Sequence, residues 1–221
     1  IEEWIKYGPS ESLLLFMYYT PKKAKRLYYD VIPKHVDEYL KHLRQFKNQN
    51  DIEKLNNPVI HIHKDKIPKA EIDISFSLIL NLVNACQSDD KNIIWNYIKE
   101  YMQDAKPSDN YYTDKLVEFS IQYYKDFVEP NKKYKKPSDE EKKILQELIK
   151  FLKKCKPKIT SEEIQNQIYE LGKKYKYELK DWFLFLYETL LGQKNGPRLG
   201  TFILLLSIKE TIKLIEDSFS R

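Results

Sequence analysis

Glycine and cysteine are scarce in this sequence. The 221 residues include five glycines, fewer than a β-rich core or a glycine-loop enzyme core is expected to use. The two cysteines, Cys86 and Cys155, form no CxxC pair, so we expect reduced structural thiols. The longest apolar runs fall far short of the roughly 20 residues that a membrane helix needs, and no signal-peptide pattern is present. We therefore expect a cytoplasmic protein with no membrane partner.

Arginine is scarce as well, and lysine supplies most of the positive charge. The net charge is +5, and only four of the 38 basic residues are arginine. Residues 1–50 carry 9 basic against 6 acidic side chains, and residues 129–180 carry 15 against 9. Residues 51–128 are acidic, with 9 against 13. Two basic regions can attract a polyanion, although a lysine-rich surface also serves solubility alone.

Helical periodicity recurs along nearly the whole chain, and no alternating pattern predicts a substantial sheet. The apolar residues from Ile144 to Leu152 follow one- and four-residue steps, as one buried helix face requires. Ser138 with Glu141, and Thr160 with Glu163, have capping-box spacing and predict helix starts. The sequence therefore predicts an all-α fold of about ten helices.

A polar, proline-punctuated segment interrupts this periodicity at residues 49–72, where only Val59–Ile62 is β-like. We expect it to be a linker between a short helical piece, residues 1–48, and a larger helical domain, residues 73–221. The basic, proline-bounded stretch near residues 129–137 predicts a possible subdomain break.

No set of residues indicates an active site: nucleophile elbow, P-loop and zinc-protease helix are all missing. His61 and His63 are separated by one residue, a spacing at which two histidines of an extended segment can bind the same metal ion. No third ligand lies nearby in sequence, so we expect no metal site. His35 and His42 are expected to be solvated on an exposed, lysine-rich helix face. We therefore predict no catalytic residue and no cofactor.

The segment from Leu190 to Gly200 is the most informative part of the chain. It contains three of the five glycines and Arg198. The pattern predicts a helix ended by glycine, a short polar loop and a new helix opened by Pro197. The planar fork of an arginine can hold a base edge or a phosphate bidentately. Capping or salt-bridging inside the turn is the alternative role for Arg198.

Tyrosine is abundant, with 17 residues. Outward rings beside lysines can stack on unpaired bases; the alternative is a ring that bridges core and surface. In residues 182–187 the apolar character surrounds the helix. That helix is therefore expected to be largely buried, with Trp182 and Phe185 in the core.

A series of short motifs runs through the sequence in a consistent order: Pro9–Phe16 with Pro21–Ala24, Val36–Tyr39, Tyr123–Val128, Ile168–Lys174, Lys180–Phe183, Tyr187–Gln193 and Gly196–Ile203. Together they resemble the C-terminal region of class I lysyl-tRNA synthetases, from just after the KMSKS loop of that family. The resemblance covers nearly the whole chain, although neither the KMSKS loop nor the HIGH-type histidine motif is present.

The resemblance implies a C-terminal fragment of a lysine–tRNA ligase whose full-length parent uses ATP to join lysine to tRNA(Lys). It implies a helical stem-contact region (1–48) and an α-helix cage that binds the anticodon (73–221). The fragment itself is expected to be inactive and monomeric, and to bind tRNA(Lys) but no DNA. The alternative is a free-standing helical protein-interaction module without RNA specificity. An independent enzyme would need a convergent set of acids and bases.

Candidate RNA contacts follow from residue type and position. The first is Arg198, beside Gly196, whose missing side chain allows a close backbone approach. The secondary candidates for phosphate contact are Lys194, Lys173, Lys174, Lys135 and Lys136. We expect salt-sensitive phosphate contacts along the tRNA, and uridine-rich anticodon bases held unstacked among aromatic and polar groups.

Overall fold

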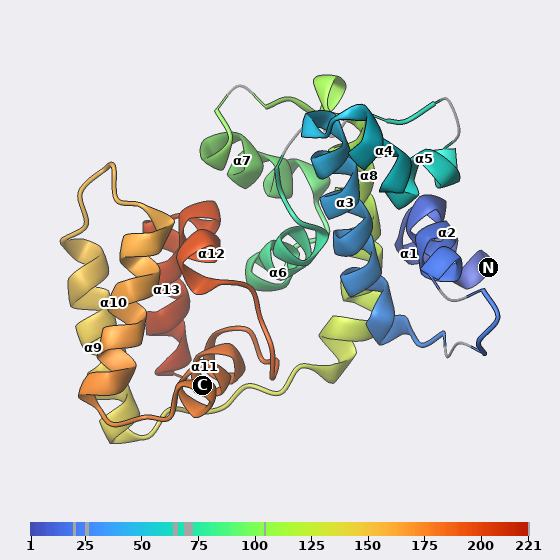
Figure 1. Ribbon diagram of the computed structural model, residues 1–221. Helices are drawn as coiled ribbons and strands as arrows, with labels where there is room; N and C mark the ends of the chain where they lie inside the picture. The colour runs from blue at the N-terminus through green and yellow to red at the C-terminus, as the bar shows by residue number, and fades with distance from the viewer. Residues whose placement is uncertain (20, 25–26, 64–65, 69–72, 104, 221) are drawn as a thin grey trace. The chain divides into compact units, whose positions relative to one another are not determined.

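The computed structural model describes residues 1–19, 21–24, 27–63, 66–68, 73–103 and 105–220. Over these residues the chain forms thirteen α-helices, ten of them with at least 7 residues, and no β-strand (Figure 1). The prediction of an all-α fold is confirmed. None of the described helices is long and apolar enough to cross a membrane.

The helices form two compact units. Unit 1 comprises residues 1–80 and 105–125, and unit 2 comprises residues 81–104 and 126–221. These borders differ from those expected from composition. The first lies inside helix α6 (Phe76–Cys86), and α8 (Tyr111–Tyr123) packs on α1 (Glu2–Tyr7) of unit 1. A polar stretch marks where periodicity stops, but burial decides which helices share a core.

Unit 1 is built around three helices that pack on one another: α2 (Ser10–Tyr19), α3 (Ile32–Asn48) and α5 (Pro58–His63). Leu15, Val36 and Tyr39 are fully buried in it. The unit also contains α4 (Asp51–Asn56) and 3-10 turns at Tyr29–Val31 and Pro107–Asp109.

The histidines of α3 are only partly exposed, because each contacts an aromatic ring of α2, so the prediction of a fully exposed face is wrong. The His42 Nε2 atom lies 2.6 Å from the Tyr19 hydroxyl of α2. The His35 ring lies edge-on to the Phe16 ring, with centroids 4.5 Å apart, and only 17% of its side chain is exposed. Periodicity placed both residues on a lysine-rich face, but α2 covers that face.

Residues 51–63, expected to lie in a linker, form α4 and α5. Asn50 caps α4 in a capping box with Glu53. The Val59 N–H donates to Asn57 Oδ1 (3.0 Å), and Val59 is fully buried. The β-like prediction for Val59–Ile62 is therefore wrong, because Asn57 and Pro58 provide a good helix start. Residues 64–65 and 69–72 of the expected linker lie outside the described residues.

Unit 2 contains most of the C-terminal helices. Its members are the end of α6 from residue 81, α7 (Lys91–Tyr101), α9 (Asp139–Lys153), α10 (Ser161–Lys174), α11 (Leu179–Leu190), α12 (Leu199–Leu206) and α13 (Ile208–Ser218), with a 3-10 turn at Glu129–Asn131. A π-helical turn at Tyr124–Val128 spans the border between the two units. Helix α10 packs on α9, α11 and α12, and α9 also packs on α13 (Figure 1). Both predicted capping boxes, at Ser138 and Thr160, are confirmed.

Two glycines allow the helices of unit 2 to pack closely. A Cβ atom on Gly200 of α12 would collide with the Ser161 carbonyl oxygen of α10. A Cβ atom on Gly172 would lie 2.6 Å from Cδ1 of Trp182. Trp182 is fully buried and Phe185 is 2% exposed, so their prediction as core residues is confirmed.

Candidate nucleic-acid interface

The loop between α11 and α12 is held in place by hydrogen bonds to its neighbours. Gly192 has φ +67° after the end of α11, as a glycine-ended helix requires. Helix α12 begins at Leu199 with Arg198 as its N-cap, so the prediction that Pro197 opens it is wrong. The Tyr187 hydroxyl donates to the Pro197 carbonyl oxygen (2.9 Å), which keeps this part of the chain out of the helix.

Gly196 lets the loop cross the face of an aromatic ring. A Cβ atom at Gly196 would collide with the Tyr187 ring. The close approach at Gly196 is therefore an approach to a side chain of α11. A larger residue here would displace the loop, together with Lys194 and Arg198.

The Arg198 side chain is exposed and only weakly engaged. Within the described chain its ion pair is with Glu162, at 3.9 Å between Nη2 and Oε1, and 54% of the arginine side chain is exposed. Its backbone is well fixed, because the next turn is anchored by a buried hydrogen bond from Gly200 N–H to Gln165 Oε1 (2.9 Å). A fixed backbone with an available guanidinium suits recognition of a phosphate or a base edge.

Three of the candidate lysines already pair with carboxylates. Lys135 donates to Glu141 (2.6 Å), and its Nζ atom lies 4.8 Å from the centre of the Phe185 ring. Burial raises the pKa of Glu141, but hydrogen bonds from Lys135 and Ser138 outweigh it and hold the pKa below its ordinary value. The other pairs are Lys173 with Glu170 at 2.8 Å and Lys174 with Glu147 at 2.7 Å.

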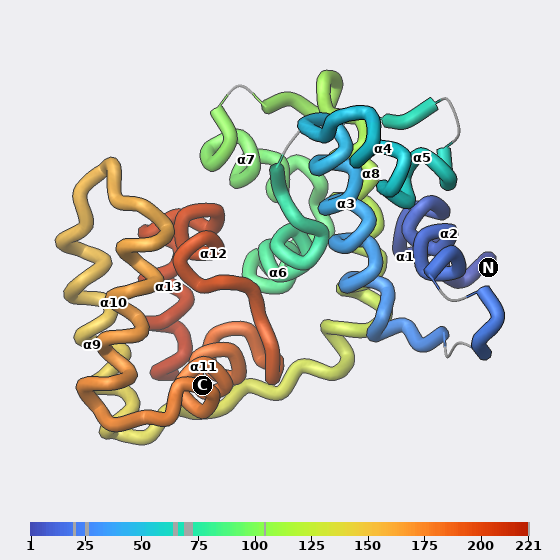
Figure 2. Tube along the Cα trace, in the orientation of Figure 1, coloured from blue at the N-terminus to red at the C-terminus, as the bar shows by residue number. Residues whose placement is uncertain are grey.

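Lys136 and Lys194 are exposed, and neither has an ion-pair partner in the part of the chain that the structure describes. Lys136 lies within the non-helical segment of residues 132–138, which precedes α9. This segment runs beside α11 (Figure 2). In that segment Lys133 N–H donates to Gly192 O (3.0 Å), and Lys135 N–H donates to Glu188 O (3.1 Å). These bonds bring the segment to the α11–α12 loop, although about 60 residues separate them in sequence.

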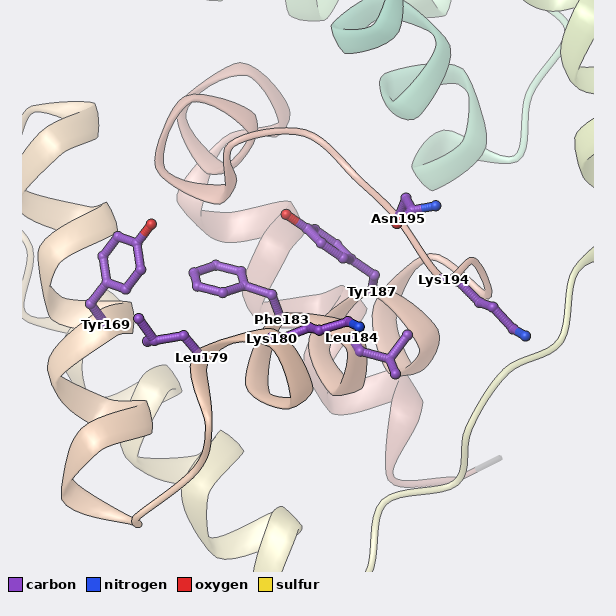
Figure 3. Close-up of a pocket in the computed structure, with 8 residues that line it drawn as sticks. All are labelled: Tyr169, Leu179, Lys180, Phe183, Leu184, Tyr187, Lys194 and Asn195. Atoms are coloured by element: carbon purple, nitrogen blue, oxygen red, sulfur yellow. The ribbon is translucent and has the colours of Figure 1, made fainter. Parts of the chain in front are cut away.

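An open pocket of about 550 Å³ lies against α10, α11 and the loop. Figure 3 shows the Phe183 ring between the rings of Tyr169 and Tyr187. The ring centroids are 5.2 Å apart for Tyr169 and Phe183, and 6.1 Å apart for Phe183 and Tyr187. The lining is completed by Leu179, Lys180, Leu184, Lys194 and Asn195.

Sequence reasoning identified only Lys194 among these pocket residues. Helix α11 was expected to be largely buried, yet Phe183 and Tyr187 are only half-buried. The missed signal is the four-residue spacing of Leu179, Phe183 and Tyr187, which places them on one helix face. Periodicity alone does not tell whether an apolar face meets another helix or lines a pocket.

The sequence of these helices matches two models of known protein families. Residues 77–218, well over half of the chain, match the family model described as "Anticodon binding domain". The chain belongs to the anticodon-binding-domain family. Residues 1–66 match the model described as "tRNA synthetases class I (K)".

Several curated relatives match nearly the whole chain, and they carry the name lysine–tRNA ligase. The protein from Rickettsia bellii (strain OSU 85-389) is 47% identical over 220 residues. Those from Rickettsia felis and Rickettsia conorii are 46% and 45% identical over 219 residues. Each match covers 98% of this chain and 42% of the relative, so the chain spans less than half the length of these relatives. The resemblance to class I lysyl-tRNA synthetases is confirmed.

Proposed function

We propose that this chain is the tRNA-binding C-terminal part of a class I lysine–tRNA ligase and that it recognises the anticodon of tRNA(Lys). The observation that carries the proposal is the family match over residues 77–218, which include the exposed Arg198 loop. The full-length parent attaches lysine to tRNA(Lys) at the expense of ATP, in the cytoplasm. This chain contributes recognition, acts as a monomer and contains no catalytic group.

The exposed cations have unequal roles in this proposal. Arg198, Lys194 and Lys136 contact the RNA, because little or no carboxylate competes for their charge. The other three candidates, Lys135, Lys173 and Lys174, contribute less, because a phosphate must first displace a paired glutamate. Gly196 acts by holding the loop against Tyr187.

The parts of the chain also have different roles. We assign anticodon binding to the region 73–221 and stem contact to residues 1–48, with residues 49–72 connecting them. Charge supports this assignment, because residues 129–180 carry 15 basic against 9 acidic side chains. Such a surface attracts the phosphate backbone, and its binding weakens steeply with salt.

Filter binding of the 221-residue chain tests the proposal. We expect tRNA(Lys) to bind at least about tenfold more tightly than the same tRNA with an anticodon uridine replaced, equivalent to about 1.4 kcal/mol. The affinity for both should fall linearly with salt on logarithmic axes. Equal, weak binding of the two tRNAs would favour a protein-interaction module instead.

Substitution of Arg198 tests its role within that binding. We expect Arg198→Ala to weaken tRNA(Lys) binding about tenfold, since one bidentate contact contributes about 1–3 kcal/mol. The matched control is Lys54→Gln, whose ammonium lies over the Phe46 ring in the connecting region, and it should bind nearly as the unmodified chain. If circular dichroism shows that Arg198→Ala loses helicity, the arginine serves the fold of the turn.

A further inference from the structure

We infer that the pocket formed by Tyr169, Phe183 and Tyr187 binds a single unstacked base of the RNA. Lys180 and Lys194, on α11 and on the loop, hold the phosphates that flank this base. The inference deepens the proposed function and rests on it, because it names the part of the RNA that this surface takes.

The three rings line the pocket without closing on one another. The planes of Tyr169 and Phe183 are inclined at 67°, and those of Phe183 and Tyr187 at 38°. Neither pair forms a parallel stack, and all three residues keep exposed surface. Figure 3 shows them as a row along the pocket. A row of partly exposed rings offers a base the aromatic faces on which unpaired bases stack.

The size and lining of the pocket suit a nucleoside. Ligand pockets have volumes of about 300–1,000 Å³, and this one has about 550 Å³. Its inner lining is apolar, with Leu179 and Leu184 beside the rings. Its polar groups are two ammonium groups, the Asn195 amide and the two tyrosine hydroxyls, and none of the eight lining residues carries a carboxylate. An apolar interior with a cationic rim is suited to a base with phosphates on either side.

The wall next to the loop is already in place before any ligand binds. The Tyr187 hydroxyl donates to Pro197 O (2.9 Å), and Gly196 lies against its ring. A tyrosine hydroxyl is protonated at neutral pH and can donate this bond, and burial raises the pKa of Tyr187 further, to about 12. A wall held in this way does not have to be ordered on binding, and that improves affinity.

The charges of Lys180 and Lys194 are not committed elsewhere. Neither has an ion-pair or hydrogen-bond partner within the described ranges. Lys173, by contrast, lies on α10 outside the pocket and is paired with Glu170 at 2.8 Å. Lys180 and Lys194 are therefore available to bind the phosphates on either side of a base in the pocket.

A double-mutant cycle between protein and RNA tests the inference. The protein is the whole chain or its Phe183→Leu variant, and the RNA is tRNA(Lys) with one abasic nucleotide, moved through the anticodon loop position by position. We expect Phe183→Leu to weaken binding of intact tRNA(Lys) about tenfold, because one base loses its stacking partner. For the tRNA that lacks this same base, the two proteins should bind equally.

Matched variants separate stacking from charge and from folding. Tyr111→Leu removes a ring of unit 1 that is 67% exposed, and it should leave every affinity unchanged. Lys180→Gln should reduce the slope of log affinity against log salt by about one, whereas Lys54→Gln, on α4 and outside the regions assigned to RNA, should not. Phe183→Tyr keeps a ring and should restore most of the affinity. If Phe183→Leu loses helicity, Tyr169→Leu replaces it in the same cycle.

The outcomes distinguish this inference from the proposed function. The inference fails if Phe183→Leu weakens the binding of every abasic tRNA by the same factor. It also fails if Phe183→Leu weakens the binding of none of them, because in both cases no base enters the pocket. In that case a preference for the correct anticodon can still stand, carried by Arg198 and the loop. If the unmodified chain shows no anticodon preference, the proposed function fails and the inference fails with it.

Discussion

Unit 1 and unit 2 are both helical, but different polar groups join their helices. All four histidines of the chain lie in unit 1, and each contacts an aromatic ring of another helix. The pairs are His35 with Phe16, His42 with Tyr19, His61 with Tyr18, and His63 with Tyr39. Unit 2 contains no histidine, and polar links between its helices include Lys174 with Glu147, Lys153 with Glu216, and the bond from the Trp182 indole N–H to the Ile168 carbonyl oxygen.

This difference makes the two units respond to acid in separate pH ranges. Burial lowers the pKa of His42, helped by Lys41 and opposed by Glu38. Burial likewise lowers the pKa of His63, opposed by Glu11. A histidine whose pKa is lowered by folding stabilises the fold above its unfolded pKa of about 6.5, and this stability is lost as the pH falls. Glu141 of unit 2, with a lowered pKa, loses its contribution only in the range below about 4.5.

The two units should differ most in how much free energy of unfolding they lose when a closely packed glycine is replaced by alanine. Gly200→Ala should lower the free energy of unfolding by about 3 kcal/mol, because the new methyl group meets the rigid Ser161 carbonyl. Gly8→Ala in unit 1 should lower it by about 1 kcal/mol, because it meets methyl groups of Val36 and Ile32 that can shift. Denaturant unfolding followed by circular dichroism measures both. Equal effects would show that the α10–α12 crossing adapts as easily as the core of unit 1.

Acidification alone, without any substitution, should destabilise unit 1 and leave unit 2 intact. On acidification from pH 7.5 to pH 5, the hydrogen-exchange protection factors, which are corrected for the intrinsic exchange rate at each pH, should fall in α2, α3 and α5 and stay unchanged in α9 and α10. The double variant His42→Gln, His63→Gln should remove this pH dependence. The matched control is His61→Gln, because His61 Nε2 lies 3.1 Å from a backbone carbonyl oxygen, that of Leu55, and not from a tyrosine hydroxyl. Parallel loss of protection in both units would contradict the comparison.

The two units should differ least in the stability that they lose when the first residue of a capping box is replaced by alanine. Ser138→Ala should lower global stability by about 1 kcal/mol, because α9 buries a full apolar stripe and its end must be paired. Asn50→Ala removes an equivalent capping box from α4, which has no buried residue. We expect local fraying of α4, seen by hydrogen exchange, with little change in global unfolding. A comparable global loss at Asn50 would mean that α4 is part of the cooperative core.

Local sequence was sufficient wherever neighbouring residues decide the structure. The capping boxes at Ser138 and Thr160 and the glycine end at Gly192 follow from side chains within a few residues of each helix end. The α9 stripe from Ile144 to Leu152 is buried as its periodicity predicted. The start of α12 was misjudged, because a distant hydroxyl, that of Tyr187, holds Pro197 out of the helix.

By itself the sequence determined the helical class, the caps, the core positions of Trp182 and Phe185, and the family, because these depend on spacing and order along the chain. Only the tertiary structure decided which cations are available and which apolar face stays open. Lys174 and Lys194 are chemically equivalent in sequence, but Lys174 pairs with Glu147, 27 residues earlier, whereas Lys194 lines the pocket. Pairing and exposure depend on contacts between residues far apart in the chain, and a local pattern contains no information about them.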